Sequence, residues 1–166
     1  MGASTAKKVL VDRYDRSLLR GYVQPQTCRT PEGLEVMSPE GAVSIIPYPQ
    51  IKCVSFVRDL EGPSALGERR EFLARPKAIG LWIELHFLDG DSLESMISNN
   101  VMEMEPDGLF ATPPENAGNA QRIFVPRAGL AGVQVLGVVG KPKPRRERPA
   151  APAFKQFKLF SEAEQG

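Results

Sequence analysis

The sequence predicts an all-β protein made of two tandem five-stranded barrels, followed by a basic, proline-rich C-terminal tail. Three observations support this fold class. Short β-type runs alternate with turn residues, helix-period stretches are missing from those runs, and the second half of the chain restates the first. The chain should divide into a flexible N-terminus at 1–6, a first β module at 7–57, a connecting segment at 58–77, a second β module at 78–138 and the tail at 139–166.

The first module contains five β-type runs, which read KKVLVDRY, LLRGYVQ, GLEVMS, VSIIPY and IKCVSFV. In the first run Val9 and Val11 alternate with Leu10 and Asp12, and the last run alternates around Ser55 in the same way. Alternation with a period of two is typical of an antiparallel strand that is buried on one face only. We therefore expect five half-buried strands before residue 58.

The connecting segment interrupts this pattern, because glycine, proline and charged residues replace the alternation. Residues Ser64 to Leu73 favour a short helix, with Ser64 as the N-cap and with Phe72 and Leu73 packing inward. Gly67 works against this helix, since glycine is a poor helix former.

The second module repeats the first, with runs that read AIGLWIELHF, DSLESMIS, GLFATPP, QRIFVPR and LAGVQVLGV. Placed in register, VDRYDRSLLRG aligns with LHFLDGDSLES, GLEVMSPEG with GLFATPPEN, and SIIPYPQIKCVSFV with RIFVPRAGLAGVQVL. The small differences in spacing fall in loops, where insertions are tolerated. Each half is therefore predicted to be one copy of a single β module.

Turn residues indicate how each copy folds. Asp89 and Gly90 are typical of a tight hairpin, whereas the first copy has Asp15 and Arg16 there, which predicts a turn of another type or a longer one. Prolines in IIPYPQI and FVPRAGL interrupt the ladder between the last two strands, because proline has no N–H to donate. A strand, a one-turn corner and a final strand would curl each sheet into a small closed barrel.

This arrangement resembles the Sm-like family of SH3-like barrels over residues 7–57 and 78–138. The stretches FVRDLEGPS, ELHFLDGDSLE and GLFATPPENAGNAQRIFVPRAGLAGVQVLG are similar to uncharacterised bacterial proteins built from two tandem Sm-like repeats. In those proteins the paired unit stands alone or accompanies signalling domains, such as PilZ or receiver domains. The resemblance implies a binding or regulatory module with no assigned activity.

Two signatures of ligand binding in related proteins are missing. Sm proteins that grip RNA carry an Asn after the second strand and an Arg-Gly pair before the last strand, and neither copy has both. The nucleotide-binding motif of PilZ domains has two parts, and DGDSLES does not have the residue spacing that the second part requires. The sequence therefore gives no support for cyclic dinucleotide binding.

Composition limits the class of protein. Hydrophobic residues make up 42% and charged residues 25% of the chain, as in soluble globular proteins. The formal net charge is +1, but residues 141–166 hold seven Lys or Arg against three Glu, and the rest of the chain holds 14 basic against 17 acidic residues.

No apolar run is long enough to span a membrane, and no secretion signal is recognisable, so we expect a cytoplasmic protein. Cys28 and Cys53 should be reduced structural thiols.

No catalytic, cofactor or metal signature is present. His86, the only histidine, is expected to be a partly exposed strand residue, on the face shared by Trp82 and Glu84. The segment AGLAGVQVLGVVG lacks the lysine of a phosphate-binding loop. An acidic patch matches no known ligand spacing and should be solvated loop charge; it comprises Glu94, Glu103, Glu105 and Asp107. We therefore predict that the protein is not an enzyme and holds neither a cofactor nor a metal ion.

Two polar features lie where the halves should meet. Arg58 with Asp59, and Arg127 at the second proline corner, are placed to form ion pairs across the junction, although Arg127 is also a candidate for contacting a partner. The loop NAGNAQR, residues 116–122, is predicted to be a polar surface loop able to hydrogen-bond a ligand or a peptide.

The C-terminal tail carries two candidate binding features. Its proline-rich basic stretch should be an extended linker, and it offers Lys141, Lys143, Arg145, Arg146 and Arg148 to a polyanion. Phe154, Phe157 and Phe160, spaced three apart, would form one stripe on a helix and could dock into a groove on a partner or on the protein itself.

These observations lead to two functional hypotheses. The first is a cytoplasmic adaptor that binds a protein partner, or a second copy of itself, through the groove between the barrels or through the phenylalanines of the tail. The alternative is an RNA-binding regulator that uses the barrels and the basic tail, in which case binding should weaken steeply with salt.

Overall fold

The computed structural model describes residues 5–140, which form ten β-strands and four single-turn 3₁₀ helices without an α-helix. The strands of the first half are β1 (Lys7–Arg13), β2 (Leu18–Val23), β3 (Leu34–Met37), β4 (Val43–Ile46) and β5 (Ile51–Val57). Those of the second half are β6 (Gly80–Phe87), β7 (Ser92–Ile97), β8 (Gly108–Ala111), β9 (Ala120–Pro126) and β10 (Leu130–Val139). The predicted all-β fold class is therefore confirmed.

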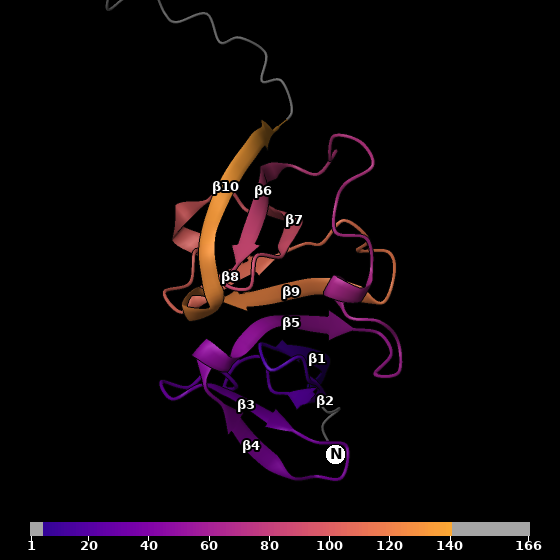
Figure 1. Cartoon of the computed structure of the whole chain (residues 1–166), viewed down its shortest axis with the longest axis vertical. Helices are drawn as coiled ribbons and strands as arrows, with labels where there is room; N and C mark the ends of the chain where they lie inside the picture. Colours follow the sequence, from indigo (N-terminus) through magenta and orange to yellow (C-terminus); the bar gives the residue numbers. More distant parts are fainter. Residues whose placement is uncertain (1–4, 141–166) are drawn as a thin grey trace, which may run out of the picture.

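The strands form a seven-stranded sheet, in the order β4-β3-β2-β1-β5-β9-β8, and a three-stranded sheet, in the order β10-β6-β7. Figure 1 shows β5 and β9 side by side where the two halves meet. Neither sheet closes on itself within residues 5–140, so the prediction of two closed barrels is wrong for this part of the chain. The physical reason is that β5 gives its second edge to β9 of the other half rather than to β4.

The proline corners were predicted correctly. A 3₁₀ turn at Tyr48–Gln50 separates β4 from β5, and another at Arg127–Gly129 separates β9 from β10. Pro47 and Pro126 occupy the N-cap position of these turns. Each final strand leaves its corner in a new direction and pairs with the first strand of its own half.

The pairing registers of the two halves correspond residue for residue. Val11 lies opposite Val54 between β1 and β5, and Leu85, the position aligned with Val11, lies opposite Val133 between β6 and β10. In both halves the register then shifts by one residue as the final strand leaves its corner. A bulge at the same aligned place in both pairs gives the two final strands the same bend.

The link between the second and third strands also corresponds. In the first half it consists of one residue pair, Tyr22 opposite Met37. In the second half it is an isolated bridge between Met96 and Thr112, whose backbone groups exchange hydrogen bonds of 2.9 and 2.8 Å. β7 and β8 are therefore neighbours although they belong to different sheets.

The first hairpin turn differs from its prediction. In the second copy the N–H of Phe87 donates to the carbonyl of Asp91, and Gly90 has a φ of 91°. The first copy forms the same hydrogen bond, from Arg13 to Ser17, and Arg16 takes the place of Gly90 with a φ of 69°. The turn is thus neither longer nor differently bonded, and Arg16 adopts the left-handed conformation that usually requires glycine.

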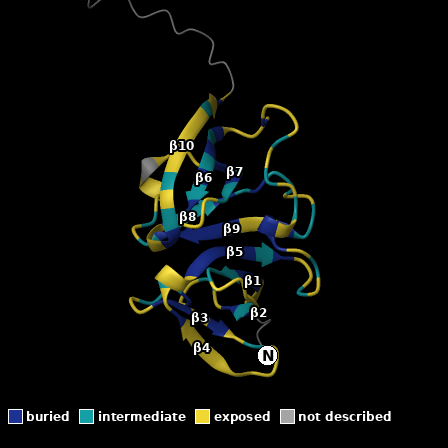
Figure 2. Cartoon of the chain, viewed as in Figure 1, coloured by how far each residue is buried: buried dark blue, intermediate teal, exposed yellow. Residues whose placement is uncertain are grey.

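Two hydrophobic clusters lie on opposite faces of β1, β5 and β9, and each receives residues from both halves. Leu10 packs in one cluster with Ile83, Leu85 and others of the second half, while Phe124 of β9 packs into the cluster of the first half. Figure 2 shows β5 and β9 as largely buried. The expectation of half-buried strands is therefore wrong for β1 and β5, since Leu10 and Ser55 are fully buried on the face covered by the other half.

The connecting segment contains only a 3₁₀ turn at Ala65–Gly67, so the predicted helix from Ser64 to Leu73 is wrong. The Ser64 side chain makes no capping hydrogen bond there. Leu73 is exposed, whereas Phe72 packs edge to face on Trp82. Gly67 and the nearby prolines disfavour helix continuation, and the segment is instead held by hydrogen bonds to the rest of the molecule.

Candidate binding site at the junction of the halves

A hollow of about 370 Å³ opens where β8 and β9 of the second half meet the first half. We call it the junction hollow. Its lining comes from β1, β2, the loop after β2, β3, β5, β8 and β9, and comprises Lys7, Val23, Pro25, Cys28, Arg29, Leu34, Val54, Phe56, Phe110, Gln121, Arg122 and Phe124. Because both halves contribute residues, the hollow depends on the pairing of β5 with β9.

Three phenylalanines form the apolar part of the hollow. The ring of Phe110 lies between those of Phe56 and Phe124, with centroid distances of 6.3 and 4.9 Å. Phe124 is buried in the core, whereas Phe56 and Phe110 are only partly buried. The hollow therefore offers accessible aromatic surface, which favours planar or apolar groups of a ligand.

Three cationic side chains surround this aromatic surface, and they differ in how far they are neutralised. The Arg29 guanidinium lies 3.0 Å from both Glu105 and Asp107. Burial alone would lower the pKa of Arg29, but the hydrogen bond that Arg29 donates to Glu105 and the charge of Asp107 outweigh burial and raise it. Within residues 5–140, neither Lys7 nor Arg122 forms an ion pair. Positive charge is therefore left over at the hollow.

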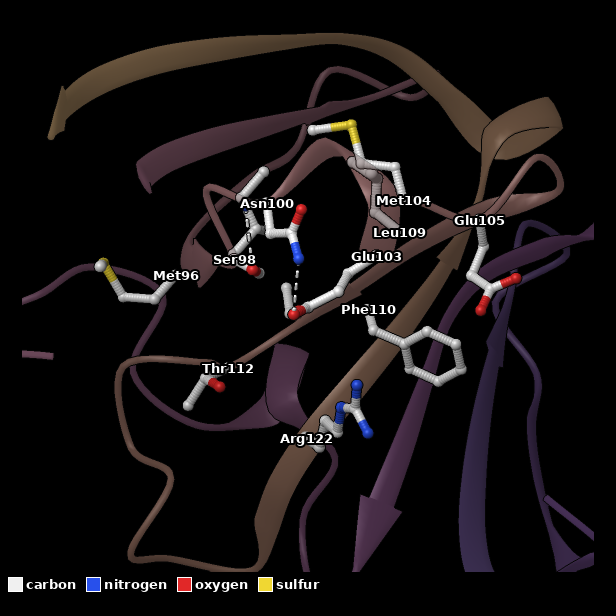
Figure 3. Close-up of a pocket in the computed structure, with 12 residues that line it drawn as sticks. Met96, Ser98, Asn100, Glu103, Met104, Glu105, Leu109, Phe110, Thr112 and Arg122 are labelled. Carbon is white, nitrogen blue, oxygen red and sulfur yellow. Dashed lines mark hydrogen bonds between the residues drawn. The ribbon is translucent and has the colours of Figure 1, made fainter. Parts of the chain in front are cut away.

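Arg122 and Phe110 also line a smaller neighbouring hollow of about 140 Å³ beneath the loop between β7 and β8. Figure 3 shows the Arg122 side chain beside the Phe110 ring, and the guanidinium carbon lies 4.4 Å from the ring centroid. This cation–π contact holds the guanidinium at the boundary of the two hollows. A ligand in either one would meet the same charge.

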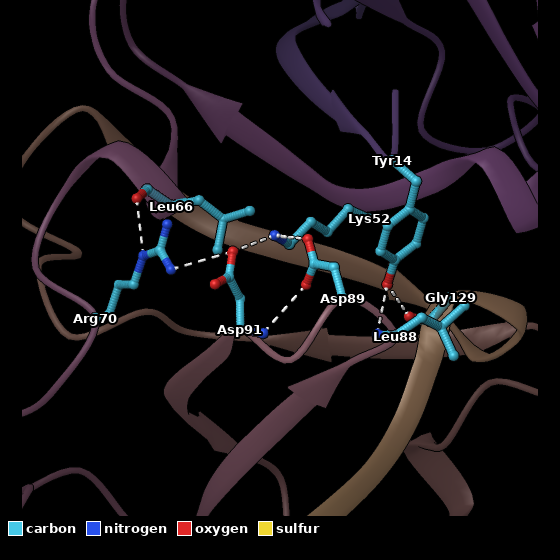
Figure 4. A network of polar contacts seen from close by, with 8 residues as sticks. All are labelled: Tyr14, Lys52, Leu66, Arg70, Leu88, Asp89, Asp91 and Gly129. Atoms are coloured by element: carbon cyan, nitrogen blue, oxygen red, sulfur yellow. Dashed lines mark hydrogen bonds and ion pairs between the residues drawn. The ribbon is translucent and has the colours of Figure 1, made fainter. Parts of the chain in front are cut away.

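On another side of the junction, a group of polar residues joins the halves; we call it the polar clamp, and it comprises Tyr14, Lys52, Arg70, Asp89 and Asp91. The Lys52 ammonium, whose side chain is only 8% exposed, lies 2.6 Å from Asp89 and 2.5 Å from Asp91 (Figure 4). Burial alone would lower the pKa of Lys52, but its hydrogen bonds to Asp89 and Asp91 raise it above its ordinary value. The clamp ties β5 to the hairpin between β6 and β7.

Tyr14 completes the polar clamp at its other end (Figure 4). Its hydroxyl donates to the carbonyl of Gly129 and accepts from the N–H of Leu88. Desolvation raises the pKa of the Tyr14 phenol, although the hydrogen bond from Leu88 opposes this. Lys52 and Arg70 are paired with Asp89 and Asp91, and Tyr14 is bonded to backbone groups of the second half, so we interpret the clamp as a structural contact between the halves rather than a ligand site.

The predicted charge pairs across the junction lie elsewhere. No ion pair involves Arg58, Asp59 or Arg127 in the part of the chain that the structure describes. Arg58 instead lies beside Gln121; with the Gln121 amide turned so that its oxygen faces the guanidinium, that oxygen accepts from Arg58 at 3.0 and 3.2 Å. Arg127 is exposed, and its backbone N–H donates to the backbone carbonyl of Asp107. The ion pairs between the halves are those of Arg29 and Lys52.

The predicted polar loop at 116–122 contacts the connecting segment through Asn119. Its amide group donates to the carbonyls of Asp59 and Pro63 and accepts from the N–H of Asp59, while its backbone N–H donates to Glu68. These bonds occupy Asn119, so this part of the loop fastens the chain between the halves.

The acidic patch expected from the sequence does not assemble as one group. Glu94 accepts hydrogen bonds from the Trp82 indole and from the backbone of Phe72, whereas Glu103 pairs with Asn100. Glu105 and Asp107 neutralise Arg29. Among residues 5–140 no cluster of His, Cys, Asp and Glu could hold a metal ion.

Three further predictions concern single residues and the tail. His86 is partly exposed and lies 3.5 Å from Glu84, as expected of a strand residue on that face. Cys28 and Cys53 are free and buried, as predicted, and burial raises the pKa of both thiols. The phenylalanines and basic residues predicted to bind partners lie outside the described residues; they are Phe154, Phe157, Phe160, Lys141, Lys143, Arg145, Arg146 and Arg148.

Residues 5–137 match the model of a family of unknown function, DUF6982. The chain belongs to this family. No curated protein and no solved structure matches the chain. The DUF6982 match ends within β10 and covers both halves and the junction between them. In the described part of this DUF6982 protein, no helix is both long and apolar enough to cross a membrane.

Sequence reasoning missed the junction hollow of this DUF6982 protein. Phe56, Phe110 and Arg122 lie in three different strands and share no local motif, so nothing in their spacing indicates that they meet. The aligned repeats carried one usable signal. At the positions that correspond in the strand registers, the second copy has Arg122 and Phe110 where the first has Val43 and Glu35, so these residues do not belong to the common pattern of the module.

Proposed function

We propose that this DUF6982 protein is a non-enzymatic adaptor that binds an acidic segment of a protein partner at the junction hollow. The observation that carries this proposal is the charge left over beside an accessible aromatic surface. Lys7 and Arg122 form no ion pair within residues 5–140, and both line the same hollow as Phe56 and Phe110. A carboxylate next to an apolar or aromatic side chain would complement these groups.

The charge distribution supports a peptide over RNA as the ligand. Nucleic acid is held by several cations that follow its phosphates, but Arg29 is neutralised by two carboxylates. Residues 1–140 also hold 14 basic against 17 acidic residues, so a polyanion would meet net repulsion there. A short segment with one or two carboxylates avoids this repulsion and fits a hollow of about 370 Å³.

The two halves are proposed to be Sm-like modules that arose by duplication. The matching registers of β1 with β5 and of β6 with β10 support this origin, as does the single residue pair that links the second and third strands of each half. A hollow at the junction of two modules is consistent with a binding role, because ligand sites commonly form between domains. The free, buried thiols are consistent with a protein that works in the cytoplasm.

The proposal is tested by fluorescence polarisation with the full chain and a labelled peptide that alternates acidic residues with phenylalanine. We expect saturable binding that Arg122→Glu weakens by at least about tenfold, because the charge that attracts the carboxylate is reversed. Arg127→Glu is the matched control, since Arg127 is exposed and outside the hollow, and it should leave the affinity within about twofold.

A labelled single-stranded oligouridylate is titrated in parallel, at several salt concentrations. The adaptor proposal is contradicted if the peptide does not bind, or if Arg127→Glu weakens it as much as Arg122→Glu does. Tight binding of the oligouridylate with a steep salt dependence would favour the RNA-binding alternative instead.

A further inference from the structure

Unneutralised positive charge at the junction extends beyond the hollow itself. Arg58, which directly follows β5, is exposed and forms no ion pair within residues 5–140. The carboxylate of its neighbour Asp59 instead accepts from the N–H of Glu61 in the following turn. The Arg58 guanidinium lies beside Gln121, and Gln121 lines the junction hollow. Arg58 therefore borders the hollow without belonging to its lining.

The strand registers place Arg58 on the face of the sheet that carries the hollow. Phe56, a lining residue, lies opposite Arg122 of β9, and Arg58 follows Phe56 by two residues, so both side chains point to the same face. The pairing of β1 with β5, continued by two residues, places Lys7 opposite Arg58. The ammonium of Lys8 donates to the Arg58 carbonyl at 3.2 Å, so β1 does lie beside Arg58.

Three cations thus occupy two successive rows of this face. Arg122 lies in the row of Phe56, whereas Lys7 and Arg58 lie in the next row, where β1 begins and β5 has ended. Such rows are two residues apart, which is roughly 6.6 Å along a strand. All three cations are exposed, and none forms an ion pair in the part of the chain that the structure describes. We call Lys7 and Arg58 the outer pair.

The outer pair is unfavourable in the free protein, because like charges that face each other across two strands repel. Arg29 shows how this molecule neutralises a cation from within, since Glu105 and Asp107 both pair with it. No carboxylate among residues 5–140 does the same for the outer pair. An anion supplied by a ligand would offset the repulsion.

We propose that Lys7 and Arg58 form a second anionic subsite, so that the partner segment carries two carboxylates in a fixed spacing. This inference rests on the proposed function, since it concerns the segment bound in the junction hollow. Alternate side chains of an extended segment point to one side and lie roughly 6.6 Å apart, which matches the spacing of the rows. The segment that fits places an aromatic side chain in the hollow, one carboxylate at Arg122 and a second, two residues further, at the outer pair.

Fluorescence polarisation of the full chain with two labelled peptides tests the subsite. One peptide contains a phenylalanine and two aspartates, each separated from the next by one serine, and the other has serine in place of the outer aspartate. Both are made in the two chain directions, and the tighter-binding direction is used throughout. We expect the two-aspartate peptide to bind the wild type at least about fivefold more tightly, because its outer carboxylate meets two cations.

Charge reversal assigns this gain to the outer pair. Arg58→Glu should reduce the advantage of the second aspartate to less than about twofold, and it should leave the affinity for the one-aspartate peptide within about twofold. A third peptide with lysine at the outer position should bind Arg58→Glu at least about fivefold more tightly than it binds the wild type. Arg127→Glu is the matched control and should preserve the advantage of the second aspartate, since Arg127 lies outside the hollow.

The possible failures are distinguishable. If the second aspartate adds less than about twofold in the wild type, while the one-aspartate peptide binds and is weakened by Arg122→Glu, the subsite is wrong and the proposed function stands. Equal loss of the advantage in Arg127→Glu and Arg58→Glu would also overturn the subsite, because the attraction would then be general. If neither peptide binds the wild type, the proposed function and this inference fail together. Circular dichroism verifies that each variant retains the fold.

Discussion

At the scale of single residues, Arg16 has a backbone conformation that suits glycine better than arginine, because the repeated hairpin requires it. It occupies the left-handed place that Gly90 fills in the second copy, with a φ of 69°. A non-glycine residue in this conformation costs roughly 1–2 kcal/mol. The first hairpin therefore keeps the shape of the second although Arg16 is unfavourable in this conformation, since the pairing of β1 with β2 fixes the turn.

We predict that Arg16→Gly raises the free energy of unfolding by about 0.5–1 kcal/mol, because the strain removed exceeds the backbone entropy that glycine adds to the unfolded chain. Urea unfolding measures this change. The reverse exchange, Gly90→Arg, should lower the free energy by a similar amount, since the position has open space and only the backbone is strained. Equal stability of Arg16→Gly and wild type would show that the turn relaxes around arginine.

The junction hollow marks the limit of prediction at this scale. The sequence suggested that Arg58 or Arg127 would pair across the junction, but the residues that do so are Arg29 and Lys52. Side-chain partners depend on how two modules face each other, and a pattern within one module carries no information about that. The partly exposed strand position of His86 was predictable because it depends only on the alternation of one strand.

At the scale of elements, the polar clamp joins β5 to the hairpin between β6 and β7. The pKa of Asp91 is lowered mainly by the hydrogen bond that its carboxylate accepts from Lys52. At Asp89 desolvation would raise the pKa, but the hydrogen bond from Lys52 outweighs it, so the pKa of Asp89 is also lowered. Carboxylates with a lowered pKa stabilise the fold above their unfolded pKa, and this contribution is lost as pH falls through the folded pKa.

The raised pKa of Lys52 gives stability the opposite dependence on pH. Its contribution is present below the unfolded pKa of a lysine and is lost as pH rises through the folded pKa. The clamp should therefore be fully effective between about pH 4 and pH 10. Both carboxylates are more than one-third exposed, so solvent screening limits the strength of the pairs.

We predict that Lys52→Met lowers the free energy of unfolding by about 1–2 kcal/mol at pH 7, because the charge-assisted hydrogen bonds to Asp89 and Asp91 are lost. The difference from wild type should shrink towards zero as pH falls below about 3, where the carboxylates are protonated. Lys77→Met, at an exposed position, serves as the control. Urea unfolding across this pH range measures the effect, and a difference that does not vary with pH would argue against the clamp.

The strands and corners were predictable from the sequence, whereas the way the sheets close was not. Alternation and proline placement report on one strand at a time, which is why all ten strands and the corners after Pro47 and Pro126 appear where expected. Leu10 was expected on an exposed face of its strand, but the second half covers that face and buries Leu10. Whether β5 pairs with β4 or with β9 is decided by contacts between distant segments, which no local pattern encodes.

At the scale of the whole molecule, the two halves form one structure. Both hydrophobic clusters combine residues of the two halves, and β5 with β9 makes a continuous sheet across them. The boundaries at 7–57 and 78–138 thus separate two copies of a pattern rather than two independent cores. The same pairing creates the junction hollow, so the binding site proposed here exists only in the paired molecule.

The central claim, that the junction hollow binds an acidic segment, is tested most directly by amide chemical shifts. The isotope-labelled full chain is titrated with the acidic, phenylalanine-containing peptide, and backbone amides are followed by NMR. We predict shifts that centre on Phe56, Phe110 and Arg122 and that disappear in Arg122→Glu, because these residues line one hollow. Shifts confined to other surfaces, or the same shifts in Arg122→Glu, would contradict the claim.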